Sequence, residues 1–252
     1  MSNCFFLKNV SVEYELAKKN TFTAIENLNL TIAKGERVVL IGASGCGKSS
    51  LLKVLSGLKK IKAGEIYYND EPLLAMQRSI VLMRQNACLL PWKKVEKNIA
   101  LPLIWQKCPK KEALAQAKAM MEKLNIAKEW GKYPLQLSGG QQQRAALAKV
   151  LLLKPQVLLL DEPFSALDAF TREAMQDLLQ MVWQKERLTY VLVTHSIEEA
   201  VYLGEKIIVM TKGGRIYQVV KNELNFSDNC RNSDEFYAAC RTLRQILEEA
   251  QA

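Results

Sequence analysis

Histidine is nearly absent from this sequence, and the cysteines show no metal-binding pattern. His195 is the single histidine, and the six cysteines include no C-x-x-C pair. A structural zinc site needs Cys and His ligands at characteristic spacings, so the sequence supports no such site. Cysteines scattered in this way through a cytosolic protein are expected to be free, reduced thiols.

Long apolar runs are missing as well. The most apolar stretch, residues 145–160, is interrupted by Lys149, Lys154 and Pro155. No segment reaches the roughly 20 uncharged residues that a membrane-crossing helix needs. The first ten residues lack the basic region, apolar region and cleavage site of a secretory signal. We therefore expect a soluble, cytosolic protein.

The remaining composition is that of a globular protein with excess positive charge. The 252 residues are 49% hydrophobic and 24% charged, which excludes collagen-like, coiled-coil and disordered chains and predicts one large domain or a core with a subdomain. The net charge of +9 favours an acidic partner such as a nucleotide, a nucleic acid or an anionic membrane. Because the basic residues lie in small groups without an aromatic nucleic-acid motif, nucleic acid is not the expected partner.

Hydrophobic patterning predicts an α/β fold interrupted by a helical segment. Apolar alternation and short β-branched runs predict strands in the first third of the chain, and strands alternating with helices return after Pro155. Between them lies an Ala-, Gln- and Lys-rich region with helical spacing. The expected strands are Cys4–Glu15, Phe22–Ala33, Glu36–Gly42, Glu65–Tyr68, Ile80–Met83, Val157–Asp161, Leu188–Thr194, Ile207–Thr211 and Arg215–Val220. The expected helices are Gly47–Gly57, Lys110–Asn125, Gly140–Leu153, Ala169–Lys185, Ile197–Leu203 and Asp234–Glu249.

The loop after the third expected strand has the pattern G-x-x-x-x-G-K-[ST]. Its residues are Gly42, Ala43, Ser44, Gly45, Cys46, Gly47, Lys48 and Ser49. Glycines let successive backbone N–H groups face phosphate oxygens, and the following helix adds positive potential at its N-terminus. Lys48 would reach the β- and γ-phosphates, and the Ser49 hydroxyl would coordinate Mg²⁺. The sequence therefore predicts binding of a nucleoside triphosphate.

Two carboxylates stand at the end of the apolar strand Val157–Asp161. Ligands bind at the carboxyl ends of parallel strands, so Asp161 and Glu162 are expected at the same edge as the phosphate loop. Asp161 would hold Mg²⁺, and Glu162 would polarise a water for attack on the γ-phosphate. The competing interpretation is that both acids cap the next helix.

A third motif identifies a family. Residues 137–144, LSGGQQQR, resemble the signature sequence of ABC-type ATPases. The resemblance implies a P-loop (RecA-like) core with a parallel sheet, an N-terminal antiparallel β subdomain and an inserted α-helical subdomain. It also implies that Ser138, Gly139, Gly140 and Gln141 bind the ATP held by a second copy, within a head-to-tail homodimer that encloses two ATP molecules.

Further family motifs match single positions of this chain. Gln85 resembles the glutamine that contacts Mg²⁺ and the attacking water, and His195 resembles the histidine that contacts the γ-phosphate. Residues 165–168, SALD, resemble the loop through which the two copies sense each other. Tyr14 resembles the aromatic residue that stacks on adenine, with Phe22 as its rival.

Two departures from the family pattern are small. Ser50 follows the metal-binding Ser49 where the family usually has threonine, and Met83 and Arg84 precede Gln85 where an aromatic residue is more usual. The family roles thus imply Lys48, Gln85, Glu162 and His195 as catalytic residues. Ser49, Gln85 and Asp161 are implied as metal ligands.

The segment Leu89–Trp92 and the residues after Asp161 and Thr194 resemble ATPase subunits of nitrate, sulfonate and taurine importers. This implies permease subunits and, indirectly, a solute-binding protein as partners, with the chain peripheral at the cytoplasmic face of the plasma membrane. Two alternatives are an exporter or lipid-trafficking ATPase and a soluble ABC ATPase of DNA repair or translation. The expected division is a core with β subdomain (1–88 and 155–220), a helical subdomain (89–154) and a helical tail (221–252).

Overall fold

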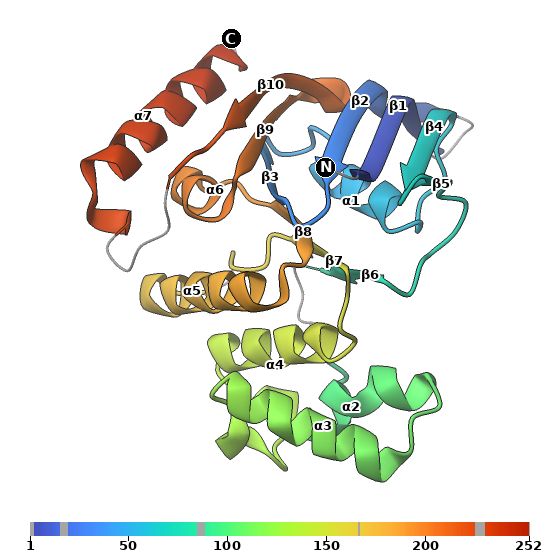
Figure 1. Cartoon of the computed structure of the whole chain (residues 1–252), viewed down its shortest axis with the longest axis vertical. Coiled ribbons are helices and arrows are strands. Elements are labelled where there is room, and N and C mark those ends of the chain that lie inside the picture. The colour runs from blue at the N-terminus through green and yellow to red at the C-terminus, as the bar shows by residue number, and fades with distance from the viewer. Residues whose placement is uncertain (1–2, 16–19, 85–88, 166, 225–229, 252) are drawn as a thin grey trace.

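The computed structural model describes residues 3–15, 20–84, 89–165, 167–224 and 230–251. It contains an antiparallel sheet, a mainly parallel sheet, and helices that cover the parallel sheet and extend below it (Figure 1). Among the described helices, none combines the length and the apolar composition needed to cross a bilayer.

Four strands form the antiparallel sheet, in the order β2-β1-β4-β5. Their bounds are β1 Asn3–Glu15, β2 Thr21–Ala33, β4 Ala63–Tyr68 and β5 Glu71–Pro72. The first two strands form a long hairpin in which Tyr14 pairs with Phe22. Residues 18–19 of the expected turn between them lie outside the described residues.

Six strands form the second sheet, in the order β10-β9-β3-β8-β7-β6, and all neighbours are parallel except β9 and β10. Their bounds are β3 Arg37–Gly42, β6 Ile80–Met83, β7 Val157–Asp161, β8 Thr189–Val193, β9 Lys206–Thr211 and β10 Arg215–Lys221. The predicted parallel sheet is therefore confirmed.

Alternate residues of these strands enter two different cores, because successive side chains of a strand point to opposite faces. Val38 and Leu40 pack with β1, β2 and α1 (Lys48–Leu55), while Val39 and Ile41 pack with the remaining helices. Since both faces are covered, the strands are apolar throughout, which is why their sequences lack alternation.

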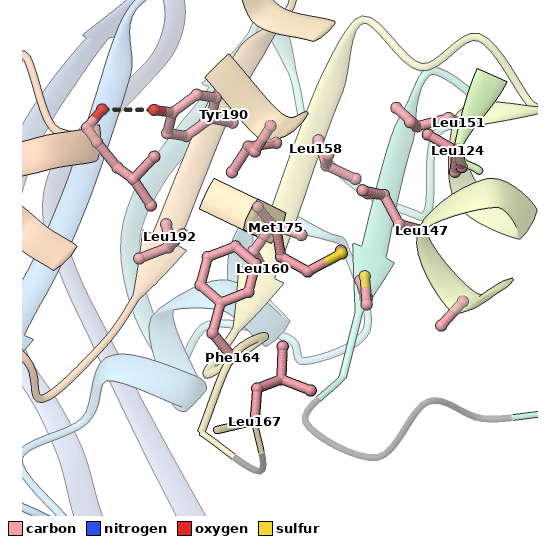
Figure 2. Close-up of a cluster of buried hydrophobic side chains, with 14 of the residues drawn as sticks. Leu124, Leu147, Leu151, Leu158, Leu160, Phe164, Leu167, Met175, Tyr190 and Leu192 are labelled. Atoms are coloured by element: carbon pink, nitrogen blue, oxygen red, sulfur yellow. Dashed lines mark hydrogen bonds between the residues drawn. The ribbon is translucent and has the colours of Figure 1, made fainter. Parts of the chain in front are cut away.

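The second face is covered by α5 (Ala169–Glu186), α6 (Ile197–Leu203) and α7 (Asp234–Glu249). Below α5 lie α2 (Val95–Trp105), α3 (Lys110–Lys123) and α4 (Gly139–Leu151), all drawn from the middle of the chain (Figure 1). One apolar cluster connects this helical block with the sheet, since it contains Leu147 and Leu151 of α4 together with Leu158 of β7 (Figure 2). Short 3-10 helices occupy Ala127–Glu129, Pro134–Gln136, Lys212–Gly214 and Cys230–Asn232.

Candidate nucleotide site

The phosphate loop is held tightly between two strands from distant parts of the chain. Gly42 has φ 152°, and a Cβ added there would lie 2.1 Å from the Met210 carbonyl oxygen of β9. Gly47 has φ 106°, and its added Cβ would lie 2.5 Å from the Ala24 carbonyl oxygen of β2. The outer residues Ser44 and Gly45 are exposed. Glycine at these two positions therefore lets the loop pack closely against both sheets, while the outer residues of the loop stay exposed.

Lys48 lies beneath this loop. Its ammonium donates to the carbonyl oxygens of Gly42 at 2.6 Å and Ala43 at 2.8 Å, and lies 3.7 Å from the Cys46 Sγ. The side chain is buried. Helix α1 begins here at Gly47 without a side-chain cap and without an acidic residue in its first turn. Its first-turn N–H groups and Lys48 therefore fit an anion such as phosphate.

Ser49 and Asp161 meet across the edge of the sheet. The Ser49 hydroxyl donates to the Asp161 Oδ1 at 2.9 Å, although 112 residues separate the two in sequence. Asp161 is the last residue of β7, so the strand places its carboxylate beside α1. A hydroxyl and a carboxylate oxygen are ligands that Mg²⁺ accepts, and the ion usually completes its shell with water and phosphate oxygens. These two residues fit the predicted Mg²⁺.

Glu162 and His195 come from the ends of neighbouring parallel strands. Glu162 has φ 46°, an uncommon left-handed conformation for a non-glycine residue, and its N–H donates to the Val193 carbonyl at 3.1 Å. Its Oε2 lies 3.7 Å from the His195 Nδ1, and the histidine side chain is 67% exposed. The competing interpretation of Asp161 and Glu162 as helix caps does not hold, because α5 is capped by Asp168 instead.

A buried carboxylate connects the histidine loop to α5. The Thr194 hydroxyl donates to the Glu199 Oε2 at 2.5 Å, and the Glu199 Oε1 lies 3.7 Å from the Arg172 Nε. Arg172 also donates to the Leu167 carbonyl at 2.8 Å. Burial raises the pKa of Glu199, while the Thr194 hydrogen bond and the Arg172 charge lower it. This link was not predicted, because the three residues have no distinctive spacing in the sequence.

The signature segment begins α4. The Ser138 Oγ accepts a hydrogen bond from the Gln141 N–H at 3.3 Å, and the Gln141 Oε1 accepts one from the Ser138 N–H at 2.9 Å. This reciprocal pair is a capping box. The Gln141 amide also donates to the Glu129 Oε1 at 2.8 Å. Ser138 is therefore the N-cap of α4.

Two contacts join this helix to the rest of the site. A Cβ added at Gly140 would lie 2.4 Å from the Thr171 Cγ2 in the first turn of α5. The Gln143 amide donates to the Pro163 carbonyl, one residue after Glu162. Asp168 caps the same turn of α5, and hydrogen bonds from Thr171 lower the pKa of its carboxyl. The Gln143 contact was not predicted, since a glutamine inside a helix carries no positional signal.

Two sequence predictions at this site concern the glutamine and the aromatic residues. Gln85 lies outside the described residues, as does Ala166 of the SALD loop. Tyr14 is half-buried, and the Lys59 ammonium lies 4.4 Å from the centre of its ring. Phe22, on the paired strand, is 49% exposed. Because the two aromatic residues are direct cross-strand neighbours, both remain candidates for stacking on a base.

Comparisons with known proteins identify the family and the fold. The family model described as ABC transporter matches residues 25–165. The aliphatic sulfonates import ATP-binding protein SsuB of Bacillus subtilis is 41% identical over 235 residues, covering 93% of this chain and 90% of that protein. The nitrate import ATP-binding protein NrtD of Synechococcus elongatus is 38% identical over 198 residues, covering 77% and 72%.

A solved structure is similar in fold as well. It is a dimeric ATP-binding cassette in a post-hydrolysis state, bound to ADP and Pi. It is 32% identical, has a TM-score of 0.78, and covers 88% of this chain and 100% of that chain. These findings confirm the predicted P-loop ATPase fold and the predicted class of ATPase that uses ATP and Mg²⁺. The family model covers more than half of the residues, so the chain belongs to the ABC transporter family.

Proposed function

We propose that this chain is the ATP-hydrolysing subunit of an importer that carries a small anionic solute across a membrane. The observation that carries the hydrolytic part is the set of contacts at one sheet edge: Lys48 under the phosphate loop, Ser49 beside Asp161, and Glu162 beside His195. The importer part rests on the sulfonate and nitrate importers to which the chain is similar. An exporter is the alternative.

Each residue then has a distinct task. Ala43 to Ser50 surround the phosphates with N–H groups, and Lys48 stabilises the β- and γ-phosphate charge. Ser49, Asp161 and Gln85 would hold Mg²⁺, which neutralises charge on the phosphate oxygens when it is bound. Glu162 accepts a proton from the attacking water, and His195 contacts the γ-phosphate from the neighbouring strand.

Two copies are needed for a complete site in this proposal. Ser138, Gly139, Gly140 and Gln141 of one copy would contact the ATP held by the other, and Tyr14 or Phe22 would stack on adenine. ATP-driven closure of the pair shifts the equilibrium of the permease subunits between their two access states. The subunit would sit at the cytoplasmic face of the plasma membrane. Residues 89–154 would be the moving helical subdomain, residues 1–88 and 155–220 the core, and residues 221–252 the tail.

Protein concentration gives a direct test of the hydrolytic proposal. ATP hydrolysis by the purified chain should require Mg²⁺, and its rate per molecule should rise with protein concentration, because the active species contains two copies. A rate per molecule that stays constant from dilute to concentrated protein, while size-exclusion chromatography shows monomers, would contradict the shared site.

Trp92 tests the coupling to a permease. Its side chain is 71% exposed, and the buried Asn98 side chain fixes the adjacent loop by accepting from the Leu90 N–H at 2.6 Å and donating to the Lys93 carbonyl at 2.8 Å. An exposed tryptophan on a rigid loop is a suitable anchor for a partner helix. Local packing of the helical block is the alternative role.

The matched control is Trp105, which is 73% exposed at the other end of α2. In vesicles that contain the chain with its permease, Trp92→Ala should abolish solute uptake but leave the ATPase rate and Tm of the isolated subunit nearly unchanged. Trp105→Ala should leave uptake intact. A large fall in Tm for Trp92→Ala would support the packing role, and ATP-driven extrusion of solute would support the exporter.

A further inference from the structure

A cavity lies at the opposite edge of the parallel sheet from the nucleotide site. It has a volume of about 730 Å³ and is bounded by Gly35 before β3, Gln156 before β7 and Thr189 at the start of β8. Asp161 and His195, in contrast, lie at the carboxyl ends of β7 and β8. We call this space the basal cavity. Its volume is within the range of about 300–1,000 Å³ typical of small-molecule sites.

The walls of the basal cavity are apolar and come from three helices. Leu124 lies just after α3, Leu151 is on α4, and Leu178, Met181 and Val182 are on α5. Met181 is 59% exposed, although methionine is usually buried. Apolar surface that faces a cavity is stabilised when a ligand displaces the water there.

The polar groups on the floor are already paired. The Tyr68 hydroxyl donates to the Ser79 Oγ at 2.9 Å, and the Thr189 Oγ1 accepts from the Gly35 N–H at 2.9 Å. The Thr189 N–H donates to the Gln156 carbonyl at 3.0 Å. The floor therefore offers little hydrogen-bonding capacity to a ligand, so a polar ligand group would bind at the rim.

The rim is strongly basic. Five cations and one acid, Glu186, line the cavity, and the cations come from both the core and the helical block: Lys34, Lys123, Lys154, Lys185 and Arg187. Within the residues that the structure describes, none of the five forms an ion pair with a carboxylate. Basic groups gathered around an opening in this way create a positive potential that attracts an anion.

Two of these cations stand at positions that favour glycine. Lys154 follows α4 with φ 47°, and Arg187 caps α5 with φ 50°. Helices very often end with glycine in this left-handed conformation, and other residues carry a steric penalty there. Basic side chains occupy both positions, and both lie at the cavity rim. Both residues therefore place a positive charge at the rim where two helices end.

We propose that the basal cavity binds a single-chain amphiphilic anion, with its alkyl chain against Leu151 and Leu178 and its anionic head group at the basic rim. Because the cavity is bounded by α3 and α4 on one side and by the sheet and α5 on the other, such a ligand would connect the helical block to the core. The proposal does not depend on the solute that the importer carries.

Calorimetry with the full chain and decanesulfonate tests the proposal. We expect one saturable site that excess ATP does not displace, and about ten-fold weaker binding of octanesulfonate, because two fewer methylenes are buried. Decanoate should bind like decanesulfonate, whereas decyl glucoside, which lacks the charge, and methanesulfonate, which lacks the chain, should bind far more weakly. Equal binding of decyl glucoside and decanesulfonate, or displacement by ATP, would overturn the proposal.

Matched variants locate the site. Met181→Glu places a carboxylate among the cations and should abolish binding of decanesulfonate, while the isosteric but neutral Met181→Gln should retain it. Lys154→Asn removes a charge at a left-handed position that asparagine tolerates, so binding should weaken about ten-fold while Tm does not fall. Lys111→Asn, on the exposed surface of α3, is the control for charge. Equal affinities for the two Met181 variants, both folded by circular dichroism, would place the ligand elsewhere.

Discussion

The two helix N-termini proposed to bind phosphate, those of α1 and α4, are constructed in opposite ways. Helix α1 starts at Gly47 with no side-chain cap, and packs against β2, β3, β7 and β8. Helix α4 starts at Ser138 with a complete capping box, and packs against α2, α3, α5 and β6. The first N-terminus is open to a ligand and fixed in the sheet, whereas the second is closed by its own side chains and belongs to the helical block.

The difference indicates that the two halves of the shared site, the α1 N-terminus of one copy and the α4 N-terminus of the other, would bind phosphate in different ways. Lys48 is buried and already in contact with the loop, so the first half is preorganised for phosphate. Ser138 is exposed, and its hydroxyl is engaged by Gln141. Because the Ser138 Oγ accepts this hydrogen bond, its hydroxyl proton remains available to donate to a phosphate oxygen, which in the proposed dimer belongs to the nucleotide of the other copy. Four substitutions test this division.

The largest effect is expected for Ser138→Arg. A bulky cation at the start of α4 opposes the helix dipole and occupies the space for the partner's phosphate. Dimer formation and ATP turnover should fall to background, while a monomer should bind ATP with unchanged affinity, as measured by calorimetry. Ser233→Arg is the control, because the Ser233 side chain caps α7 and likewise accepts a hydrogen bond from the backbone N–H three residues later. If the Ser138→Arg monomer binds ATP more weakly, the N-termini of α1 and α4 contact the same ATP within one chain, which contradicts a site shared between two copies.

Glu162→Gln should leave ATP binding intact and lower turnover by about 10²–10⁴-fold, the usual contribution of a general base. The amide keeps the shape of the side chain but accepts no proton. The variant should accumulate as an ATP-bound dimer on size-exclusion chromatography. Glu173→Gln, on the exposed surface of α5, should turn over normally. Normal turnover by Glu162→Gln itself would remove Glu162 from this role.

Lys48→Ala should weaken ATP binding by about 10- to 100-fold, the value of a charged hydrogen-bond donor. Lys48 belongs to the phosphate loop of a single copy, so the fall in ATP affinity should appear in monomers as well as in dimers. Ser138→Arg, in contrast, should leave the affinity of the monomer unchanged. Calorimetry at low protein concentration measures it, with Lys111→Ala as control. Unchanged affinity would contradict the position of Lys48 beneath the phosphates.

The smallest effect is expected for Gly140→Ala. The added methyl group would overlap the Thr171 Cγ2 at the contact between α4 and α5, and such overpacking costs about 1–3 kcal/mol of unfolding free energy. Thermal unfolding should show this loss, and adding Thr171→Ser, which removes the clashing methyl, should restore Tm. If the double variant is no more stable than Gly140→Ala, the two helices do not meet at this contact.

Local signals predicted most of the fold and the nucleotide side of the site. Helix α6, helix α7 and strands β6 and β7 have the predicted bounds, because periodicity and caps are local features. Helix α2 was not predicted: Pro102 lies inside it, and its last seven residues, Ile99–Trp105, are all apolar and therefore show no helical stripe. The neighbours of β3 were also unpredictable, since no local feature selects β8 and β9 from the later strands.

Contacts between distant segments account for what the sequence left open at the site. The sequence indicated Glu162 as a base, but its left-handed backbone and its proximity to His195 depend on how β7 and β8 pair. The Thr194, Glu199 and Arg172 link and the Gln143 contact join segments whose separations in sequence have no characteristic value. The basal cavity is bounded by residues near the C-terminal ends of α3, α4 and α5 and by residues at the starts of β3, β7 and β8. No sequence motif describes such an arrangement.

The position of β3 determines when the nucleotide site can form during synthesis. This strand lies between β8 and β9, and Gly42 packs against Met210, which is 168 residues later in the chain (210 − 42). Contacts at such separation form late, because the intervening chain must close a large loop. Until β9 has left the ribosome, the phosphate loop therefore lacks its support, although its own residues were made early. ATP binding by a growing chain would accordingly report that about five-sixths of it has been synthesised and folded.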